Sequence, residues 1–240
     1  MLSLPLLGTD RSVELRPSKI VALGLNYREH VAELGHVLPG PDGKVAAREL
    51  PKEPLLFSKG PNVLVGTGEA IVLPSTFLAR SGIENPRTDF EAELAIVIGE
   101  RMRRVAPEAA LSFVLGYSCF NDVSQRNIQN GDRSGWFRGK SFDSFGPIGP
   151  VIVPAGRIGN PQDLAISCRL NGRLVQSART SAMIFTIAEL LSYISWNMTL
   201  EPGDIVATGT PSGVGALSPG DIVEVEIEGI GVLSNPVVAG

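Results

Sequence analysis

Short apolar runs separated by glycine and proline recur along the whole chain. Some runs alternate apolar and polar positions and others are continuously apolar, which is typical of strands half or fully buried in sheets. Asn171-Gly172 lies between two such runs and is a strong hairpin signal, because both central positions of a tight two-residue turn need positive φ. The pattern predicts strands at Ile20–Leu25, Pro54–Ser58, Ala70–Leu73, Phe90–Ile98, Phe113–Phe120, Ile148–Val153, Leu164–Leu170, Arg173–Gln176, Asp204–Thr208, Asp221–Ile227 and Gly231–Leu233.

Helical periodicity is rarer than the strand pattern. One segment near the C-terminus carries an apolar stripe at helical spacing, which is typical of a helix packed on the core. Near the N-terminus, Asn26 can cap a short helix, with Glu29 completing a capping box and Gly35 ending it. We expect helices at Tyr27–Leu34, Pro107–Leu111 and Ile187–Met198.

Many strands and few helices predict an α+β fold that is predominantly β. A chain of 240 residues can bury a substantial core as one domain without structural metals or disulfides. We expect residues 1–17 to form an N-terminal arm and residues 18–240 to form the functional domain. The stretch 36–52 is polar and rich in turn formers, so we expect a mobile loop there.

Composition and charge narrow the class of partner. The chain has 21 basic and 25 acidic residues, for a net charge of −4, which argues against nucleic-acid or anionic membrane surfaces and favours a small-molecule partner. Cys119 and Cys168 lie in apolar runs and are expected to be buried free thiols, as in a reducing cytoplasm. No secretory signal or membrane-spanning apolar segment is recognisable. A cytoplasmic protein is therefore expected.

Scarce histidine restricts the metal chemistry. The only two histidines are His30 and His36. Zinc sites built from several imidazole or thiolate ligands are therefore excluded. A bound metal must take mostly carboxylate ligands, which points to a hard cation such as Mg²⁺, Mn²⁺ or Ca²⁺.

Asp89, Glu91 and Glu93 stand at alternate positions of one predicted strand. Alternate residues of a strand share a face and lie about 6.7 Å apart, so these carboxylates are aligned. Asp122 follows another apolar strand directly and is a candidate for a further ligand from a separate segment. Two or three carboxylates with water are what Mg²⁺ usually takes. The alternative is a solvated strand end, where the charges discourage the edge of the sheet from pairing with a strand of another molecule.

His30 and Glu33 lie three positions apart and are neighbours on one helix face. A carboxylate beside an imidazole fixes its tautomer and raises its basicity, as in a general base that activates water. The alternative is an ordinary surface pair. His36 has no evident partner and is expected to be exposed.

Several segments together resemble one family. They are Gly24-Leu-Asn-Tyr-Arg-Glu-His-Val-Ala-Glu33, Asp89-Phe-Glu-Ala-Glu-Leu94, Asn121-Asp-Val-Ser-Gln-Arg-Asn-Ile-Gln129, Gly139-Lys-Ser-Phe-Asp143 with Gly146-Pro-Ile-Gly-Pro150, and Leu200-Glu-Pro-Gly-Asp204 with Thr208-Gly-Thr-Pro211. In this order they resemble the fumarylacetoacetate hydrolase family. The resemblance covers about residues 18–237. It is nearest to the single-domain bacterial members, such as 2-hydroxyhepta-2,4-diene-1,7-dioate isomerases and acylpyruvate hydrolases.

The resemblance implies a mixed β-roll or sandwich that forms homodimers. It further implies one Mg²⁺ or Mn²⁺ per subunit, for which Ca²⁺ can substitute in a crystal, and a lid helix over residues 26–35. By motif position, the implied site consists of Glu91, Glu93 and Asp122 as metal ligands, His30, Glu33 and Lys140 as catalytic groups, and Arg126, Gln129 and Thr210 as substrate contacts.

Two departures from the family pattern surround the arginine. Gln125 and Asn127 stand where members often have alanine and aspartate, so the hydrogen bonds that hold Arg126 are expected to differ. Asp89 is not implied as a ligand, and we expect it to have a structural role.

The reaction implied by the resemblance is hydrolysis of a C–C bond in a 2-oxo acid such as an acylpyruvate or fumarylpyruvate. The cation would stabilise the pyruvate enolate that forms. The same site could instead isomerise a 2-hydroxyhepta-2,4-diene-1,7-dioate type of compound or decarboxylate an oxaloacetate type. A different class of function is a metal-stabilised β domain that binds a ligand without turnover.

Overall fold

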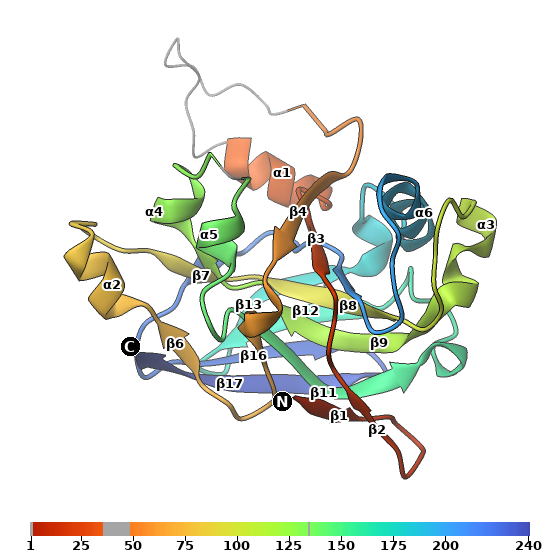
Figure 1. The fold of residues 1–240 in the computed structure, drawn as a ribbon. Coiled ribbons are helices and arrows are strands. Elements are labelled where there is room, and N and C mark those ends of the chain that lie inside the picture. Colours follow the sequence, from red (N-terminus) through yellow and green to blue (C-terminus); the bar gives the residue numbers. More distant parts are fainter. Residues whose placement is uncertain (1, 36–48, 134) are drawn as a thin grey trace.

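Two facing β-sheets form most of the molecule (Figure 1). The structure is a computed structural model that describes residues 2–35, 49–133 and 135–240. The larger sheet has the order β4 (Leu55–Lys59), β3 (Ile20–Gly24), β14 (Ile205–Ala207), β8 (Ala92–Ile98), β9 (Val114–Asn121), β11 (Gly146–Pro154) and β5 (Leu64–Val65). The second has the order β13 (Arg173–Arg179), β12 (Ala165–Leu170), β16 (Ile222–Ile227), β17 (Gly231–Ala239) and β6 (Ile71–Leu73).

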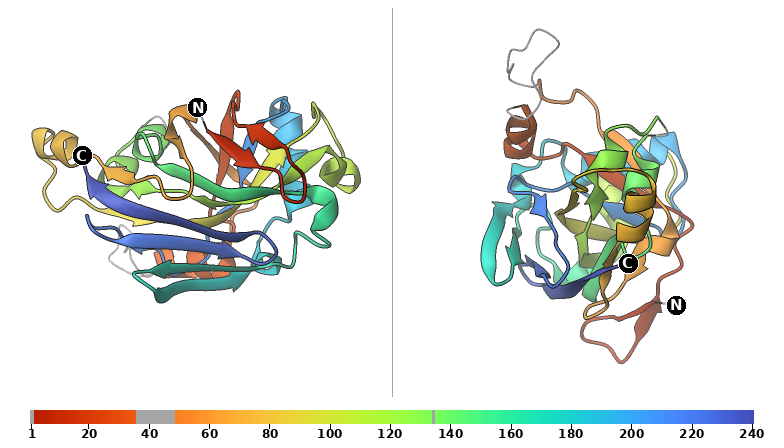
Figure 2. Two further views of the ribbon diagram at one scale, coloured as in Figure 1. Left: turned by 90° about the horizontal axis from the view of Figure 1, so that it is seen from below. Right: turned by 90° about the vertical axis from the view of Figure 1, so that its left-hand side faces the viewer.

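Contacts of β11 with β17, β9 with β16, and β8 with β12 bring the two sheets together, and the stacked layers are visible in Figure 2. Both sheets are mixed, because β14 pairs in parallel with β3, and β17 with β6, whereas most other pairs are antiparallel. The expected fold, α+β and predominantly β with a mixed roll or sandwich, is confirmed.

The burial of each strand follows its sequence pattern. All seven residues of β8 are buried, as expected for a strand that is covered on both faces, and the one charged residue among them is Glu93. In β16 buried residues alternate with more exposed ones, as expected where only one face meets the core. The predicted hairpin is present, since β12 and β13 pair directly across Asn171 and Gly172, whose φ angles are 53° and 77°.

Two small sheets complete the strand arrangement. One is the hairpin of β1 (Ser3–Pro5) and β2 (Ser12–Glu14), which was not predicted and rests on β11 in the segment expected to be an N-terminal arm. The other has the order β10 (Ser124–Gln125), β7 (Thr88–Phe90) and β15 (Gly215–Ala216).

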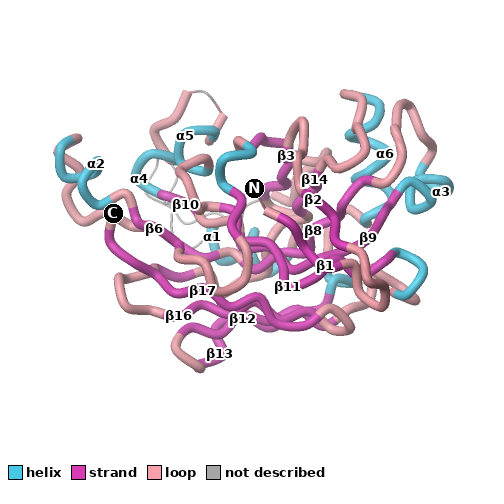
Figure 3. The backbone as a smooth tube through the Cα atoms, turned by 60° about the horizontal axis from the view of Figure 1, so that its bottom comes forward, coloured by secondary structure: helices cyan, strands magenta, loops and turns pink. Residues whose placement is uncertain are grey.

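Helices lie outside the two sheets (Figure 3). Among the described residues, no helix is both long and apolar enough to cross a membrane. In Figure 1, α1, α4 and α5 lie along one side of the molecule, and α3 and α6 pack together at one end. The helices are α1 (Arg28–Gly35), α2 (Ser75–Arg80), α3 (Pro107–Ala110), α4 (Arg126–Gln129), α5 (Phe137–Lys140) and α6 (Ile187–Asn197).

The structure corrects two local expectations. The single strand predicted over Phe90–Ile98 is interrupted at Glu91, because β7 pairs with β10 and β15 while β8 pairs with β9 and β14. Asn26 does not cap α1: its side chain donates to the carbonyls of Phe185 and Thr208 and accepts from the Phe185 N–H. The cap prediction was wrong because distant backbone groups compete for the same amide. His36 and most of the loop predicted at 36–52 lie outside the described residues.

Candidate metal and catalytic site

Three buried carboxylates meet where β8 and β9 pair. Antiparallel register places Ala92 opposite Asn121, so Glu91 and Asp122 flank the same end of this strand pair. The Asp122 N–H donates to the Glu91 carbonyl at 2.9 Å. Ligand oxygens of Glu91, Glu93 and Asp122 all lie within 4.8 Å of one another. Since the three side chains are almost fully buried, the alternative of a solvated strand end is wrong.

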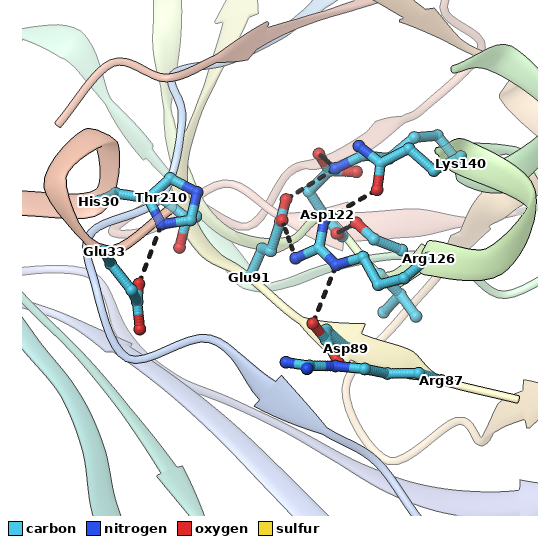
Figure 4. Close-up of polar contacts among 12 residues, drawn as sticks. His30, Glu33, Arg87, Asp89, Glu91, Asp122, Arg126, Lys140 and Thr210 are labelled. Atoms are coloured by element: carbon cyan, nitrogen blue, oxygen red, sulfur yellow. Dashed lines mark hydrogen bonds and ion pairs between the residues drawn. The ribbon is translucent and has the colours of Figure 1, made fainter. Parts of the chain in front are cut away.

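Two buried lysines bind this carboxylate cluster. Lys140 Nζ lies 2.7 Å from Glu91 and 2.5 Å from Asp122 (Figure 4). Lys59 Nζ lies 2.6 Å from the other oxygen of Asp122. Burial lowers the pKa of Lys59, whereas Asp122 and Glu91 raise the pKa of Lys140 against the effect of its burial. Lys140 was singled out from the sequence, but Lys59 was not.

Glu93 carries the least compensated charge of the three. It accepts a hydrogen bond from the Gly209 N–H at 2.9 Å. Burial, followed by the negative charges of Asp122 and Glu91, raises the pKa of Glu93 well above its usual range. Within the described part of the chain, the buried Tyr27 hydroxyl and the Asn121 side-chain N–H₂ have no hydrogen-bond partner.

These features fit a divalent cation. The donor set is entirely carboxylate oxygen, which suits Mg²⁺ and Mn²⁺. A cation would also relieve the repulsion that raises the pKa of Glu93. The residues present therefore support a divalent metal site formed by Glu91, Glu93 and Asp122.

Arg126 is held at the edge of the cluster by three side chains. Its guanidinium donates to Asp89 at 2.9 Å, to Glu91 at 2.5 Å and to Gln129 at 2.8 Å. Asp89 also accepts from Arg87, so its carboxylate aligns two arginines and has the structural role expected. Burial alone would raise the pKa of Glu91, but Lys140 and Arg126 hold it well below its usual range.

The side chains at the two departures from the family pattern, Gln125 and Asn127, form their hydrogen bonds with groups other than the Arg126 guanidinium. Gln125 caps α4 by accepting from the Ile128 N–H, and its amide donates to Asn127 and to the Arg87 carbonyl. Asp89, which comes from β7, and Glu91 supply the carboxylates that hold the arginine.

His30 and Glu33 form a pair on α1. His30 Nδ1 lies 3.2 Å from Glu33, and the second ring nitrogen points toward the Glu91 side of the site (Figure 4). His30 is only 5% exposed, so the alternative of an ordinary surface pair is wrong. The hydrogen bond from His30 lowers the pKa of Glu33, and the Gly213 N–H adds to this.

The glycine-rich segment 208–215 connects α1 to the carboxylate cluster. Gly209 donates to Glu93, and Gly213 donates to Glu33 at 3.2 Å. Thr210 Oγ1 accepts a hydrogen bond from Gln176. Gly213 has a φ of +96°, and a Cβ there would lie 2.1 Å from the Val175 carbonyl oxygen, so this position requires glycine.

Sequence reasoning identified the carboxylates and missed some of the groups that surround them. The only sequence signal for Lys59 is that it is a charged residue at the end of an apolar strand, and this signal is weak. The unpartnered hydroxyl of Tyr27 and the buried amide of Gln176 give no sequence signal on their own, because both are ordinary residues of amphipathic segments.

Comparison with known proteins places these residues in a family. Residues 19–238 match the family model for the fumarylacetoacetate (FAA) hydrolase C-terminal region. The chain is 40% identical over 232 residues to the mitochondrial oxaloacetate tautomerase FAHD2B of Bos taurus, covering 93% of this chain and 67% of that protein.

Two solved structures are similar over nearly the whole chain. The fumarylpyruvate hydrolase of Pseudomonas aeruginosa, in complex with Mn²⁺ and pyruvate, is 31% identical with a TM-score of 0.83, covering 100% of this chain and 96% of that one. The 2-hydroxyhepta-2,4-diene-1,7-dioate isomerase of Mycobacterium marinum is 37% identical with a TM-score of 0.78, covering 96% and 82%. The chain therefore belongs to the fumarylacetoacetate hydrolase family.

Proposed function

We propose that this protein is a divalent-cation-dependent hydrolase that cleaves a C–C bond in a 2-oxo acid of the acylpyruvate or fumarylpyruvate type. The observation that carries the proposal is the His30–Glu33 pair, which turns its second ring nitrogen toward the buried carboxylate cluster (Figure 4). A relative that binds Mn²⁺ and pyruvate and matches this chain over nearly its full length supports it.

Glu91, Glu93 and Asp122 would hold the cation. When bound, it supplies positive charge that polarises the 2-oxo group and stabilises negative charge developing on its oxygen. Lys140 contributes a further positive charge beside Glu91 and Asp122. We assign the substrate contacts to Arg126, Gln129 and Thr210.

The pairing of His30 with Glu33 supports a role for His30 as a general base. An ionised Glu33 can only accept, so Nδ1 of His30 carries the hydrogen and Nε2 is free to take a proton. Nε2 would remove a proton from water as the water oxygen attacks the distal carbonyl. The bond between that carbonyl carbon and the adjacent CH₂ then breaks, and protonation of the carbon gives one carboxylic acid and pyruvate.

The second candidate function is keto–enol tautomerisation or isomerisation at the same site, without attack by water. The identity to an oxaloacetate tautomerase supports it. In that reaction His30 would move a proton between carbon and solvent, and no C–C bond would break. Decarboxylation of an oxaloacetate-type acid is a third use of the same groups.

The test is a substrate panel in ¹⁸O-labelled water with Mg²⁺ or Mn²⁺. Hydrolysis of acetylpyruvate or fumarylpyruvate would place ¹⁸O in the released acid. A change in enol absorbance without products would indicate tautomerisation, and release of CO₂ would indicate decarboxylation; either alone would overturn the hydrolase proposal. Binding of these acids without turnover would identify a non-catalytic binding domain. Gel filtration with light scattering would test the homodimer that we also propose.

The ligand assignment is tested with Glu91→Ala and Glu93→Ala. Each variant should lose metal-dependent activity and bind Mn²⁺ far more weakly by calorimetry. Glu108→Gln, an exposed glutamate on α3, is the matched control and should behave as the wild type. Full activity in either site variant after chelator treatment would contradict the assignment.

A further inference from the structure

Gln176 is a buried amide that joins the second sheet to the candidate site. It lies in β13 and is 1% exposed. Its Oε1 accepts from the Ala92 N–H at 3.0 Å, between Glu91 and Glu93. Its Nε2 donates to Thr210 Oγ1 at 2.9 Å and to the Pro211 carbonyl at 2.8 Å. One side chain therefore contacts both the strand that carries two carboxylates and the segment that carries Thr210.

The direction of these hydrogen bonds is fixed by chemistry. A backbone N–H can only donate and a backbone carbonyl can only accept, so Oε1 must face Ala92 and Nε2 must face Pro211. The same Nε2 group faces Thr210, whose hydroxyl oxygen must then accept. The hydroxyl of Thr210 cannot turn its proton toward Gln176.

Thr210 consequently keeps its own proton for another acceptor. It is 3% exposed, and its hydroxyl donates to no residue in the described ranges. The preceding residue, Gly209, donates to Glu93, so Thr210 adjoins the carboxylate cluster. A buried hydroxyl with an unused proton beside this cluster suits an oxygen of a bound anion.

We propose that Gln176 is a positioning residue that fixes Thr210 as a hydrogen-bond donor to the bound ligand. The hydrogen bond that its Oε1 accepts from the Ala92 N–H fixes the amide in the orientation that presents Nε2 to Thr210. The backbone carbonyl of Val175, its neighbour in β13, lies close against Gly213, so the same strand adjoins the segment that donates to Glu33. The identity of the ligand as a 2-oxo acid rests on the proposed function.

A double-mutant cycle separates this role from simple core packing. The variants are Gln176→Met, which keeps the approximate volume without hydrogen bonds, Thr210→Val, and the two combined. Affinity of the Mg²⁺-loaded protein for oxalate, a stable mimic of a 2-oxo acid enolate, is measured by calorimetry, and thermal unfolding is recorded for each.

Each single variant should bind oxalate about tenfold more weakly, as expected for loss of a hydrogen bond to an ionised ligand. The double variant should be no weaker than Thr210→Val alone, because Gln176 acts through the Thr210 hydroxyl. Thr210→Ser should retain wild-type affinity. Losses that multiply in the double variant, or wild-type affinity in Gln176→Met, would overturn the proposal.

Gln176→Glu keeps the inference testable if the methionine variant does not fold. The glutamate retains the side-chain shape and still accepts from the Ala92 N–H. An ionised carboxylate cannot donate, however, so the Thr210 hydroxyl would donate its proton to this carboxylate and not to the ligand. Repulsion of oxalate by the new charge is measured in the Thr210→Val background. A larger loss of affinity where Thr210 is present than in the Thr210→Val background supports the proposal, and equal losses in both backgrounds contradict it.

The same measurements distinguish failure of the inference from failure of the proposed function. A wild type that binds oxalate but turns over no 2-oxo acid contradicts the proposed function, and the cycle still tests Gln176. A wild type that turns over a 2-oxo acid while the losses multiply contradicts only the inference. No binding of oxalate or pyruvate by the Mg²⁺-loaded wild type would overturn both.

Discussion

Helices α1 and α6 are held in place in opposite ways. The N-terminus of α6 has a complete capping box, in which Thr186 and Glu189 bond each other's backbone N–H groups. Ile187, Leu190 and Ile194 are almost fully buried, so apolar packing holds its inner face. The position of α6 thus depends on its own sequence and on the core.

Polar contacts to the candidate site hold much of α1. Glu29 accepts from Ser212, and Glu33 accepts from Gly213, more than 170 positions away. Val31 supplies buried apolar contact, but no capping box like that of α6 is found in the described part of α1. Helix α6 therefore serves stability, whereas the order of α1 is linked to the groups around the candidate site.

The largest expected effect concerns the chemistry on α1. His30→Ala should lower kcat by about 10²- to 10⁴-fold, the usual contribution of a general base. Its unfolding free energy should fall by only about 1 kcal/mol, a typical cost of a single substitution. Steady-state kinetics and urea denaturation measure both quantities. Trp196→Ala, at an exposed position of α6, is the control and should leave kcat unchanged; an unchanged kcat in His30→Ala would remove this residue from the mechanism.

The next effect should be structural and confined to α6. Leu190 is fully buried, so Leu190→Ala should lower the unfolding free energy by about 2–5 kcal/mol through lost burial and a residual cavity. Denaturant titration measures this loss. The kcat per folded molecule should stay at the wild-type value, and a large fall in kcat without loss of stability would refute the separation of roles between the helices.

A smaller effect is expected at the capping box. Thr186→Ala removes the hydroxyl that accepts from the Glu189 N–H and should cost about 1 kcal/mol. Thermal and urea unfolding should both report it, with Thr186→Ser as the conservative control. Equal stability of the alanine and wild-type proteins would show that core packing alone determines where α6 begins.

The smallest effect is a pH dependence confined to α1. The hydrogen bond from His30 lowers the folded-state pKa of Glu33 below 4.5, so its stabilising contribution is fully present above pH 4.5 and is lost as the pH falls through the lower, folded value. Because Glu33 is 35% exposed, solvent screening keeps this contribution small. Hydrogen exchange of α1 amides, corrected for intrinsic rates, should quicken in this range relative to α6. Glu33→Gln should abolish the difference, and an equal change in α6 would contradict a local origin.

The sequence predicted elements whose stability is local. The Asn171-Gly172 hairpin and α6 follow from turn geometry and helical periodicity, and both are present. The interruption at Glu91 was not predicted because alternation continues through it. The interruption is evident only in the structure, where β7 and β8 pair with different strands.

Charge pairing was the least predictable property of the candidate site. Alternation places Phe57 and Lys59 on one face of β4, and both are buried. A lysine becomes buried there only because Asp122, 63 positions away, offers a carboxylate. The wrong cap at Asn26 has the same cause, since the partners of its side chain lie about 160 to 180 positions away. Spacing along the chain contains no information about such distant partners.

The two cysteines have a consequence for spectroscopy. Cys119 and Cys168 are fully buried free thiols, as predicted, and burial raises the pKa of each to about 12. Since the thiolate is the reactive species, both should resist alkylation at neutral pH. A cysteine introduced at the exposed Ala32 of α1 would then be the sole site of rapid labelling. A spin label or fluorophore there would report helix motion on ligand addition without removal of either native cysteine.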